Sequence, residues 1–301
     1  MILLSSGFLK RFVALFKAIP VDFVFIHREC APIGPPIFEW ILAKILRKKI
    51  IYDFDDAIWL TDKTNEHWLE RITRWRKKVS SICTWSYKVS AGNSYLADYA
   101  KRFNENVTVN PTTIDTKHVH QFRGANNQTN SSQRIVIGWT GSHSTLKYLN
   151  EVESVLDAIE KKFPFVEFWF IADQPPKFKL GRMHFKPWSL QTEITDLSQF
   201  DIGIMPLPDD EWTRGKCGFK ALQYMSLEIV PVVSPVGVNT KIVQNGLNGF
   251  IANSFEEWFG TLSLLIEDSA LRKEIGKNAR EQVETNYSVA SNTKNFLMLF
   301  Q

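Results

Sequence analysis

The chain contains little cysteine, with three residues in 301: Cys30, Cys83 and Cys217. They are odd in number and widely scattered, so they do not describe the disulfide framework of a small secreted domain. They also lack metal-ligand spacing with the six histidines. His118 and His120 form an HxH pair in a polar region, which we interpret as a surface pair. We therefore expect a reduced, cytoplasmic chain without a metal site.

The sequence has no apolar run near the roughly 18 uninterrupted residues that a membrane span requires. Residues 1–20 mix Leu, Phe and Val with Lys10, Arg11 and Lys17, and no small-residue cleavage site of a signal peptide follows. This stretch fits a surface helix packed on the core, which we favour. It also fits an interfacial amphipathic helix, so peripheral association with the inner face of a membrane is an alternative.

The sequence has little excess of either charge: it contains 36 Lys and Arg and 32 Asp and Glu, so the net charge is +4. That balance is too diffuse to indicate nucleic-acid binding. The sequence GWTGSHS at 138–144 does not fit the G-x-G-x-x-G of dinucleotide oxidoreductases, which argues against that class. The hydrophobic content of 44% is typical of a globular protein, and the length suits two domains.

Short apolar runs alternate with amphipathic segments, which predicts an α/β protein with parallel sheets. The predicted strands are 21–26, 49–54, 89–92, 107–109, 134–139, 166–172, 184–187, 202–206 and 229–234. The predicted helices include 35–48, 64–78, 93–99, 146–162, 193–200, 216–228 and 270–285. We interpret the stripe of Trp68, Leu69, Ile72 and Trp75 as core. The polar, aperiodic segment 122–133 predicts a linker between two domains.

Polar residues follow two strands of the first domain, and the carboxyl ends of parallel strands are where ligands gather. His27 comes directly after the strand at 21–26, where it either caps the strand or takes part in chemistry. Asp53, Asp55 and Asp56 end the strand at 49–54. Three carboxylates so close together could bind a divalent ion, contact a substrate, or complement the dipole of a following helix.

In the second domain, Gly141 and Ser142 lie in a small, hydroxyl-rich loop after the strand at 134–139. Such a loop can cradle a phosphate, or its serine can cap the next helix. Lys216 and Lys220 are four residues apart, which predicts that they share one face of the helix at 216–228. Two ammonium groups at a helix N-terminus suit a diphosphate, although an ordinary solvated lysine face is the alternative. The loop at Gly237 could add backbone N–H donors.

Four stretches resemble the donor half of GT-B glycosyltransferases, in particular the retaining, nucleotide-sugar-dependent family 4. They are DIGIMPL (201–207), RGKCGFKALQYMS (214–226), PVVSPVGVN (231–239) and VQNGLNGFIA (243–252). YDFDDAIW (52–59) and IGWTGSHSTLKYL (137–149) are similar to further family segments. The resemblance implies two Rossmann-like domains whose parallel sheets face a central cleft. The domains are 1–121, rejoined by a closing helix at 289–301, and a donor domain at 134–288.

The resemblance also implies roles for individual residues. His27 matches a histidine that faces the transferred sugar, Asp55 and Asp56 line the acceptor side, and Lys220 stabilises the departing diphosphate. Donor-binding positions are Gly141, Ser142, Trp188, Lys216, Lys220, Gln223, Gly237, Val238 and Asn239. The family closes the helix at 216–228 with two acids, the second of which binds ribose. Here Gly215 and Gln223 occupy those positions.

The implied activity is metal-independent, retaining transfer of a sugar from a nucleoside diphosphate sugar to a glycan or lipid-linked acceptor. Surface polysaccharide synthesis is the implied setting, and no cofactor or nucleic acid is expected. Family members begin with additional strands, whereas this chain starts just ahead of the strand at 21–26, so the N-terminal sheet is expected to be shortened. The alternative is therefore a nucleotide-sugar-binding protein with little or no transferase activity.

Overall fold

The computed structural model describes residues 2–63, 66–121 and 134–301, and the chain divides into two compact units. Unit 1 comprises Met1–Thr112, Asp210–Cys217 and Thr293–Gln301, and unit 2 comprises Thr113–Asp209 and Gly218–Asn292. The linker predicted at 122–133 lies outside the described residues. Within the described part of the chain, no helix has both the length and the apolar character needed to cross a membrane.

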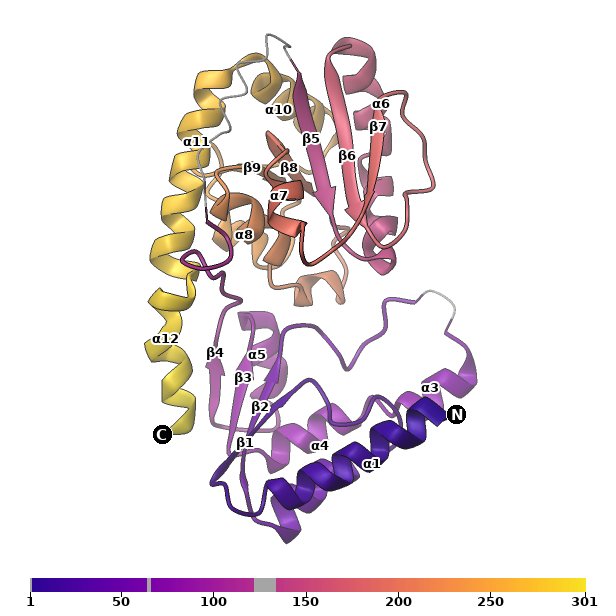
Figure 1. The fold of residues 1–301 in the computed structure, drawn as a ribbon, viewed down its shortest axis with the longest axis vertical. Helices are drawn as coiled ribbons and strands as arrows, with labels where there is room; N and C mark the ends of the chain where they lie inside the picture. Colours follow the sequence, from indigo (N-terminus) through magenta and orange to yellow (C-terminus); the bar gives the residue numbers. More distant parts are fainter. Residues whose placement is uncertain (1, 64–65, 122–133) are drawn as a thin grey trace. The chain divides into compact units, whose positions relative to one another are not determined.

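Unit 1 is built on four parallel strands in the order β1-β2-β3-β4 (Figure 1). The strands are β1 (Phe23–His27), β2 (Lys49–Phe54), β3 (Lys88–Ala91) and β4 (Val107–Val109). The helices are α1 (Ile2–Lys17), α2 (Ile37–Trp40), α3 (Trp68–Arg74), α4 (Lys78–Trp85) and α5 (Ser94–Ala100). Helix α12 (Val289–Leu297) begins in unit 2 and ends in unit 1. Residues 50–52 and Phe54 of β2 are buried, as expected of a parallel strand that is covered on both faces.

The apolar stripe predicted to be core on the helix at 64–78 is not buried, so that interpretation is wrong. The segment forms two helices, because Trp75 adopts a left-handed conformation (φ 49°) that ends α3. Helix α3 buries none of its residues. The core position is taken by α4, whose Val79 and Ile82 pack in the cluster around β2.

Unit 2 contains six parallel strands in the order β10-β9-β8-β5-β6-β7. The strands are β5 (Ile135–Thr140), β6 (Val166–Ala172), β7 (Met183–Pro187), β8 (Ile202–Met205), β9 (Val230–Val233) and β10 (Phe250–Ile251). The helices are α6 (Glu153–Lys162), α7 (Glu193–Leu197), α8 (Phe219–Ser226), α9 (Asn239–Ile242), α10 (Phe255–Glu267) and α11 (Ser269–Gln282).

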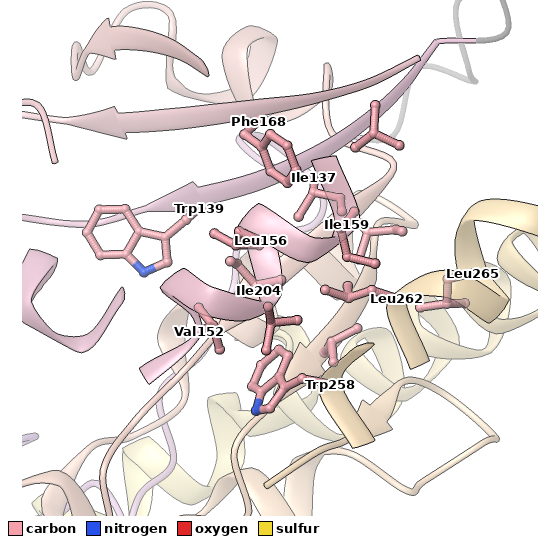
Figure 2. Packing of buried hydrophobic residues seen from close by; sticks show 14 of the residues in the cluster. Ile137, Trp139, Val152, Leu156, Ile159, Phe168, Ile204, Trp258, Leu262 and Leu265 are labelled. Atoms are coloured by element: carbon pink, nitrogen blue, oxygen red, sulfur yellow. The ribbon is translucent and has the colours of Figure 1, made fainter. Parts of the chain in front are cut away.

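The largest core cluster of unit 2 lies between the sheet and two helices. Figure 2 shows Trp139 of β5 and Phe168 of β6 with Leu156 of α6, and beyond them Trp258 and Leu262 of α10. All five side chains are buried, so the helices cover one face of the sheet with a continuous apolar layer. Burial of each large apolar side chain contributes about 1.5–3 kcal/mol.

Every predicted strand is present, with ends within two residues of the prediction. The helices agree less well, because their ends depend on local turns that apolar periodicity does not report. Helix α2 passes into a wider turn at Ile41–Ile45, and tight turns at His143–Glu151 precede α6. Helix α8 begins only at Phe219, three residues later than predicted, because Gly218 adopts a left-handed conformation (φ 72°).

Strands β5 and β8 pair over only two residue pairs and then diverge. Tyr224 bridges the divergence: the Thr140 N–H donates to its hydroxyl (3.1 Å), which in turn lies 3.4 Å from the Ile204 carbonyl. Gly203 makes room for the Tyr224 ring, because a Cβ there would lie 2.4 Å from it. The fully buried tyrosine therefore replaces the missing ladder hydrogen bonds.

Tyr224→Phe should lower the free energy of unfolding by about 1–3 kcal/mol, because it leaves the buried Thr140 N–H without an acceptor. Urea denaturation measures the change. Tyr287→Phe is the matched control, since no hydrogen bond of that hydroxyl is seen among the described residues. Equal stability of the two variants would contradict the bridging role.

Candidate functional site

The sheet of unit 2 has the strand order of dinucleotide-binding folds, read from β7 as 3-2-1-4-5-6. In such sheets the order reverses between the first and fourth strands, here β5 and β8, and ligands bind beyond their carboxyl ends. Two predicted residues lie there, both against the Trp139 ring. The Lys220 ammonium is 5.5 Å from the centre of the ring, and a Cβ on Gly141 would lie 2.6 Å from its Cη2 atom. The fold thus brings Lys220 and the Gly141 loop together.

The loop after β5 differs in detail from a simple phosphate cradle. The Gly141 N–H donates to the Ile171 carbonyl (3.0 Å) and is therefore already used by the protein. The Ser142 side chain is exposed and lies 2.9 Å from the Ser144 hydroxyl. Neither serine side chain forms a capping hydrogen bond at the start of the turns at His143–Glu151. The exposed hydroxyls, rather than the Gly141 amide, are the groups that this loop offers to a ligand.

The loop after β9 is braced from inside by Asn239. This buried side chain donates to the Ser234 carbonyl (3.1 Å), and the Ser234 hydroxyl accepts from the Leu207 N–H (2.9 Å) after β8. Asn239 thus holds the loop in place with its amide. Gly237 is exposed with φ 57°, and Val238 is half-buried, so these two lie at the surface of the loop.

Glu193, which the sequence reasoning missed, links two predicted residues at the start of α7. The Trp188 indole N–H donates to its Oε1 (3.0 Å), and the buried Gln223 amide donates to the same oxygen (3.3 Å). The Trp188 ring is half exposed at the carboxyl end of β7. The Glu193 carboxylate therefore lies beside Gln223, although position 223 itself lacks the acid that the resemblance implies. No linear motif could have revealed it, because it lies thirty residues away along the chain.

The prediction that His118 and His120 form a surface pair is wrong for His120. His118 is exposed, but only 6% of His120 is exposed, and neither of its ring nitrogens has a hydrogen-bond partner among the residues that the structure describes. Burial lowers the pKa of His120, while the charges of Glu193 and Asp115 oppose that effect. Among the described residues, no group of three or more His, Cys, Asp or Glu is arranged to hold a metal ion.

In unit 1, His27 ends β1 and is oriented by Asp53 of the neighbouring strand. Its Nδ1 lies 2.7 Å from Asp53 Oδ2, and the Ser90 hydroxyl donates to the other oxygen of that carboxylate (2.6 Å). The parallel register places His27 directly opposite Asp53, which explains the contact. The other ring nitrogen, Nε2, belongs to the half-exposed side of the ring and lies 3.8 Å from Asp55 Oδ1.

The remaining carboxylates after β2 are neutralised by two cations of unit 1. Arg28 donates through Nε to Asp55 (2.8 Å) and through a terminal nitrogen to Asp56 (2.9 Å). Lys216 donates to the other oxygen of Asp56 (2.8 Å). Arg28 itself adopts a left-handed conformation (φ 61°), which ends β1. The carboxylates are therefore bound by the chain's own cations.

This ion pair overturns the prediction that Lys216 and Lys220 share a helix face. Lys216 has an extended backbone (ψ 141°) between a tight turn and Gly218, and it belongs to unit 1. Lys220 lies in the first turn of α8 in unit 2. The spacing rule for helices fails here because the chain is not helical between the two residues.

Gly215 shows why an acid is absent at its position. A Cβ on Gly215 would lie 2.9 Å from the Ala57 backbone nitrogen and 2.8 Å from its Cβ. Asn93 further fixes this segment, because its amide donates to the carbonyls of Gly215 and Lys216 (3.1 Å each). A side chain at 215 would require the backbone after β2 to move.

The surroundings of Asp55 favour its ionised carboxylate, and those of Cys217 favour its protonated thiol. Burial opposes ionisation of Asp55, but the hydrogen bond and charge of Arg28 outweigh it and lower the pKa of the carboxyl. Burial, followed by the charges of Asp55 and Asp56, raises the pKa of the Cys217 thiol. The Cys217 thiol lies 3.1 Å from the Asp55 carbonyl and serves as a weak donor. It is a structural group, not a nucleophile.

Comparison with solved structures identifies the fold. Sucrose-phosphate synthase from Thermosynechococcus elongatus matches 97% of this chain with 76% of its own, at TM-score 0.72 and 13% identity. HepE from Anabaena, solved with UDP and glucose, matches 96% with 80%, at TM-score 0.72 and 14% identity. A Rickettsia africae glycosyltransferase matches 98% with 80%, at TM-score 0.67 and 14% identity.

The chain has a GT-B glycosyltransferase fold. The predicted α/β class with two parallel sheets is thereby confirmed. At 13–14% identity the GT-B likeness concerns the fold, and the assignment to family 4 stays a prediction. No protein-family model matches the sequence, and no curated protein matches it.

Asp55→Asn should reduce the acid sensitivity of the GT-B fold. The folded-state pKa of Asp55 lies below its ordinary value of 3.8, so its contribution to stability is present above that pH and is lost as the pH falls through the folded pKa. The natural chain should therefore lose more unfolding free energy between pH 5 and pH 3 than the variant. Urea denaturation at each pH measures this. Asp98→Asn, at an exposed i,i+3 pair, is the control; matching pH profiles of the natural chain and Asp55→Asn would contradict the assignment.

Proposed function

We propose that this protein transfers a sugar, with retention of configuration, from a nucleoside diphosphate sugar to a glycan or lipid-linked acceptor. The observation that carries the proposal is the placement of Lys220 and the Gly141 loop at the switch point of the unit 2 sheet. The GT-B fold supports it, and so do solved neighbours that contain UDP or UDP-glucose. Surface polysaccharide synthesis in the cytoplasm is the setting that we propose for it.

The donor would lie along the carboxyl ends of the unit 2 strands. Its base would stack on the half-exposed Trp188 ring, which offers a flat apolar face. Its diphosphate would meet the Lys220 ammonium, the Ser142 hydroxyl and the backbone of Gly237 and Val238. Lys220 would then stabilise the negative charge that develops as the diphosphate departs.

Glu193 would supply the ribose contact that the neutral Gln223 cannot supply by charge. Two donors, from Trp188 and Gln223, converge on Oε1 of Glu193 and fix its orientation. Its carboxylate can accept from a vicinal diol, whereas the Gln223 amide already donates to it. The pair would thereby replace the second of the two family acids, the one that binds ribose.

On the acceptor side, His27 would contact the reacting sugar through Nε2, because Asp53 holds its other nitrogen. Asp55 and Asp56 would orient acceptor hydroxyls through lone pairs not taken by Arg28 and Lys216. The chain's own cations bind these carboxylates, which supports catalysis without a metal. Activity that persists after treatment with EDTA would test this part of the proposal.

Lys220→Ala should weaken binding of a nucleoside diphosphate at least tenfold, because the ammonium group beside Trp139 at the switch point is lost. A thermal-shift screen against UDP, GDP, ADP and their sugars first identifies the base, since ligand that binds only the folded state raises the melting temperature. Titration of the variant with that diphosphate then measures the loss. Lys277→Ala, an exposed lysine of α11, is the control. Unchanged affinity of Lys220→Ala would remove the phosphate assignment.

Glu193→Gln should reduce discrimination between a ribonucleoside diphosphate and its 2′-deoxy analogue, because the charged acceptor for the diol is lost. Calorimetric titration of both ligands gives the affinity ratio, which should fall roughly five- to tenfold. Glu256→Gln, at an exposed position in α10, should leave the ratio unchanged. A preserved ratio in Glu193→Gln would place ribose recognition elsewhere.

Donor binding without turnover is the second candidate, and the ion pair between Lys216 and Asp56 favours it. That pair engages one of the two lysines expected at the diphosphate. Release of free sugar, or transfer to added acceptors, distinguishes the two functions. Ligand binding with no turnover across the donor panel would establish the second.

A further inference from the structure

Helix α1 presents an apolar stripe to solvent in addition to the face that it packs on unit 1. Phe8 and Leu15 contact the core, and the Phe8 ring lies 5.8 Å from that of Phe38. On another face, Leu9 is 67% exposed, Val13 is half exposed and Phe16 is 71% exposed. The spacing of four and three residues places these three side chains in one row along the helix. The helix therefore packs on unit 1 with one face, as the favoured alternative predicted, and exposes an apolar row on another face.

Helix α3 adds a second exposed apolar row, which the sequence had suggested to be core. Trp68 is 61% exposed, Ile72 is 58% exposed and Trp75, just after the helix, is half exposed. Amphipathic rings such as these concentrate where an apolar phase meets water. A seven-residue helix that buries no side chain, with one exposed tryptophan in it and another directly after it, indicates an unfilled docking surface.

Helices α1 and α3 of unit 1 border one cavity of about 340 Å³, and Figure 1 shows α3 near the N-terminal end of α1. Phe12 of α1 and Thr73 of α3 line it, together with Ile37 between them along the chain. The Gly34 N–H also donates to the Thr73 carbonyl (2.6 Å), which fixes α3 to this segment. Phe12 and Ile37 are half exposed, so the apolar surface continues from helix to helix through the mouth of the cavity.

Positive charge accompanies this apolar surface. Helix α1 contains no acidic residue, and Lys10 and Lys17 are exposed at the margin of its apolar row. Arg71 is exposed on α3, and Lys77 follows it. These four cations enter no ion pair with any residue that the structure describes. Apolar side chains bordered by unpaired cations complement a surface that is apolar within and anionic at its edge.

We infer that α1 and α3 together dock unit 1 onto the surface of an anionic phospholipid membrane. Phe16, Trp68 and Trp75 enter the boundary between headgroups and acyl chains, while Lys10 and Lys17 contact headgroup phosphates. A second copy of the chain fits this surface less well, since a symmetric contact would bring the same cations together. The inference is independent of sugar transfer, because none of these residues belongs to the proposed donor or acceptor machinery.

Flotation of the full-length protein with vesicles tests this inference in the absence of any donor. Vesicles of phosphatidylcholine with 30% phosphatidylglycerol should carry the protein upward in a density gradient, whereas pure phosphatidylcholine should carry much less. Binding should fall in 1 M salt, where charges are screened within about 3 Å. Equal flotation with both lipids would overturn the role of charge, and absence from both would overturn docking itself.

Substitutions in α1 and α3 separate the apolar contribution to membrane binding from the electrostatic contribution. Phe16→Glu and, separately, Trp68→Ala with Trp75→Ala should each lower the vesicle partition coefficient tenfold or more. Lys10→Gln with Lys17→Gln should lower it roughly fivefold for each charge removed, and only for anionic vesicles. Leu190→Glu, at a leucine of unit 2 that is 71% exposed, is the matched control and should leave partitioning unchanged.

Two further measurements distinguish loss of membrane binding from loss of folding and from self-association. Circular dichroism and the nucleoside diphosphate thermal shift should be unchanged in the α1 and α3 variants, so that lost flotation is not lost folding. Sedimentation equilibrium without lipid should show no self-association that the same substitutions abolish. A dimer removed by Phe16→Glu would overturn the membrane assignment and make this surface a contact between copies of the chain.

Discussion

The separation of β5 from β8 is the constraint on which the organisation of unit 2 depends. Pairing between these strands stops after two residue pairs, and the Tyr224 hydroxyl spans the gap between Thr140 and Ile204. Parallel strands that diverge at the reversal of strand order leave space beyond their carboxyl ends. Lys220 lies one turn before Tyr224 on the same helix, so the residue that bridges the two strands also fixes the helix that carries the cation.

Unit 1 uses a different device, a chain of charge-assisted hydrogen bonds. His27 and Arg28 leave β1 in succession and bind the carboxylates that leave β2, with Lys216 completing the set. Because Arg28 and Lys216 bind the carboxylates of Asp55 and Asp56, the loop carries polar chemistry without an isolated buried charge. Lys216 reaches this loop because residues Asp210–Cys217 belong to unit 1, although the strand and helix on either side of them belong to unit 2.

The exposed apolar rows of α1 and α3 suggest how one protein can both transfer a sugar and bind a membrane. Helices α1 and α3 contribute little to the core and expose aromatic and aliphatic side chains next to lysines. Such a surface is costly for a freely diffusing protein, because exposed apolar area promotes association. Docking at a membrane would bury this apolar area among the lipids and would bring the proposed transferase near lipid-linked acceptors.

The sequence by itself determined the strands, the parallel α/β class and the GT-B likeness, because buried parallel strands are continuous apolar runs that can be read directly. It also located His27 and the carboxylates at the ends of β1 and β2, since strand ends can be located from those runs. Tertiary structure alone decided that Lys216 pairs with Asp56, that Glu193 joins Gln223, and that the α3 stripe stays exposed. These outcomes depend on contacts between distant segments, which neither spacing nor periodicity encodes.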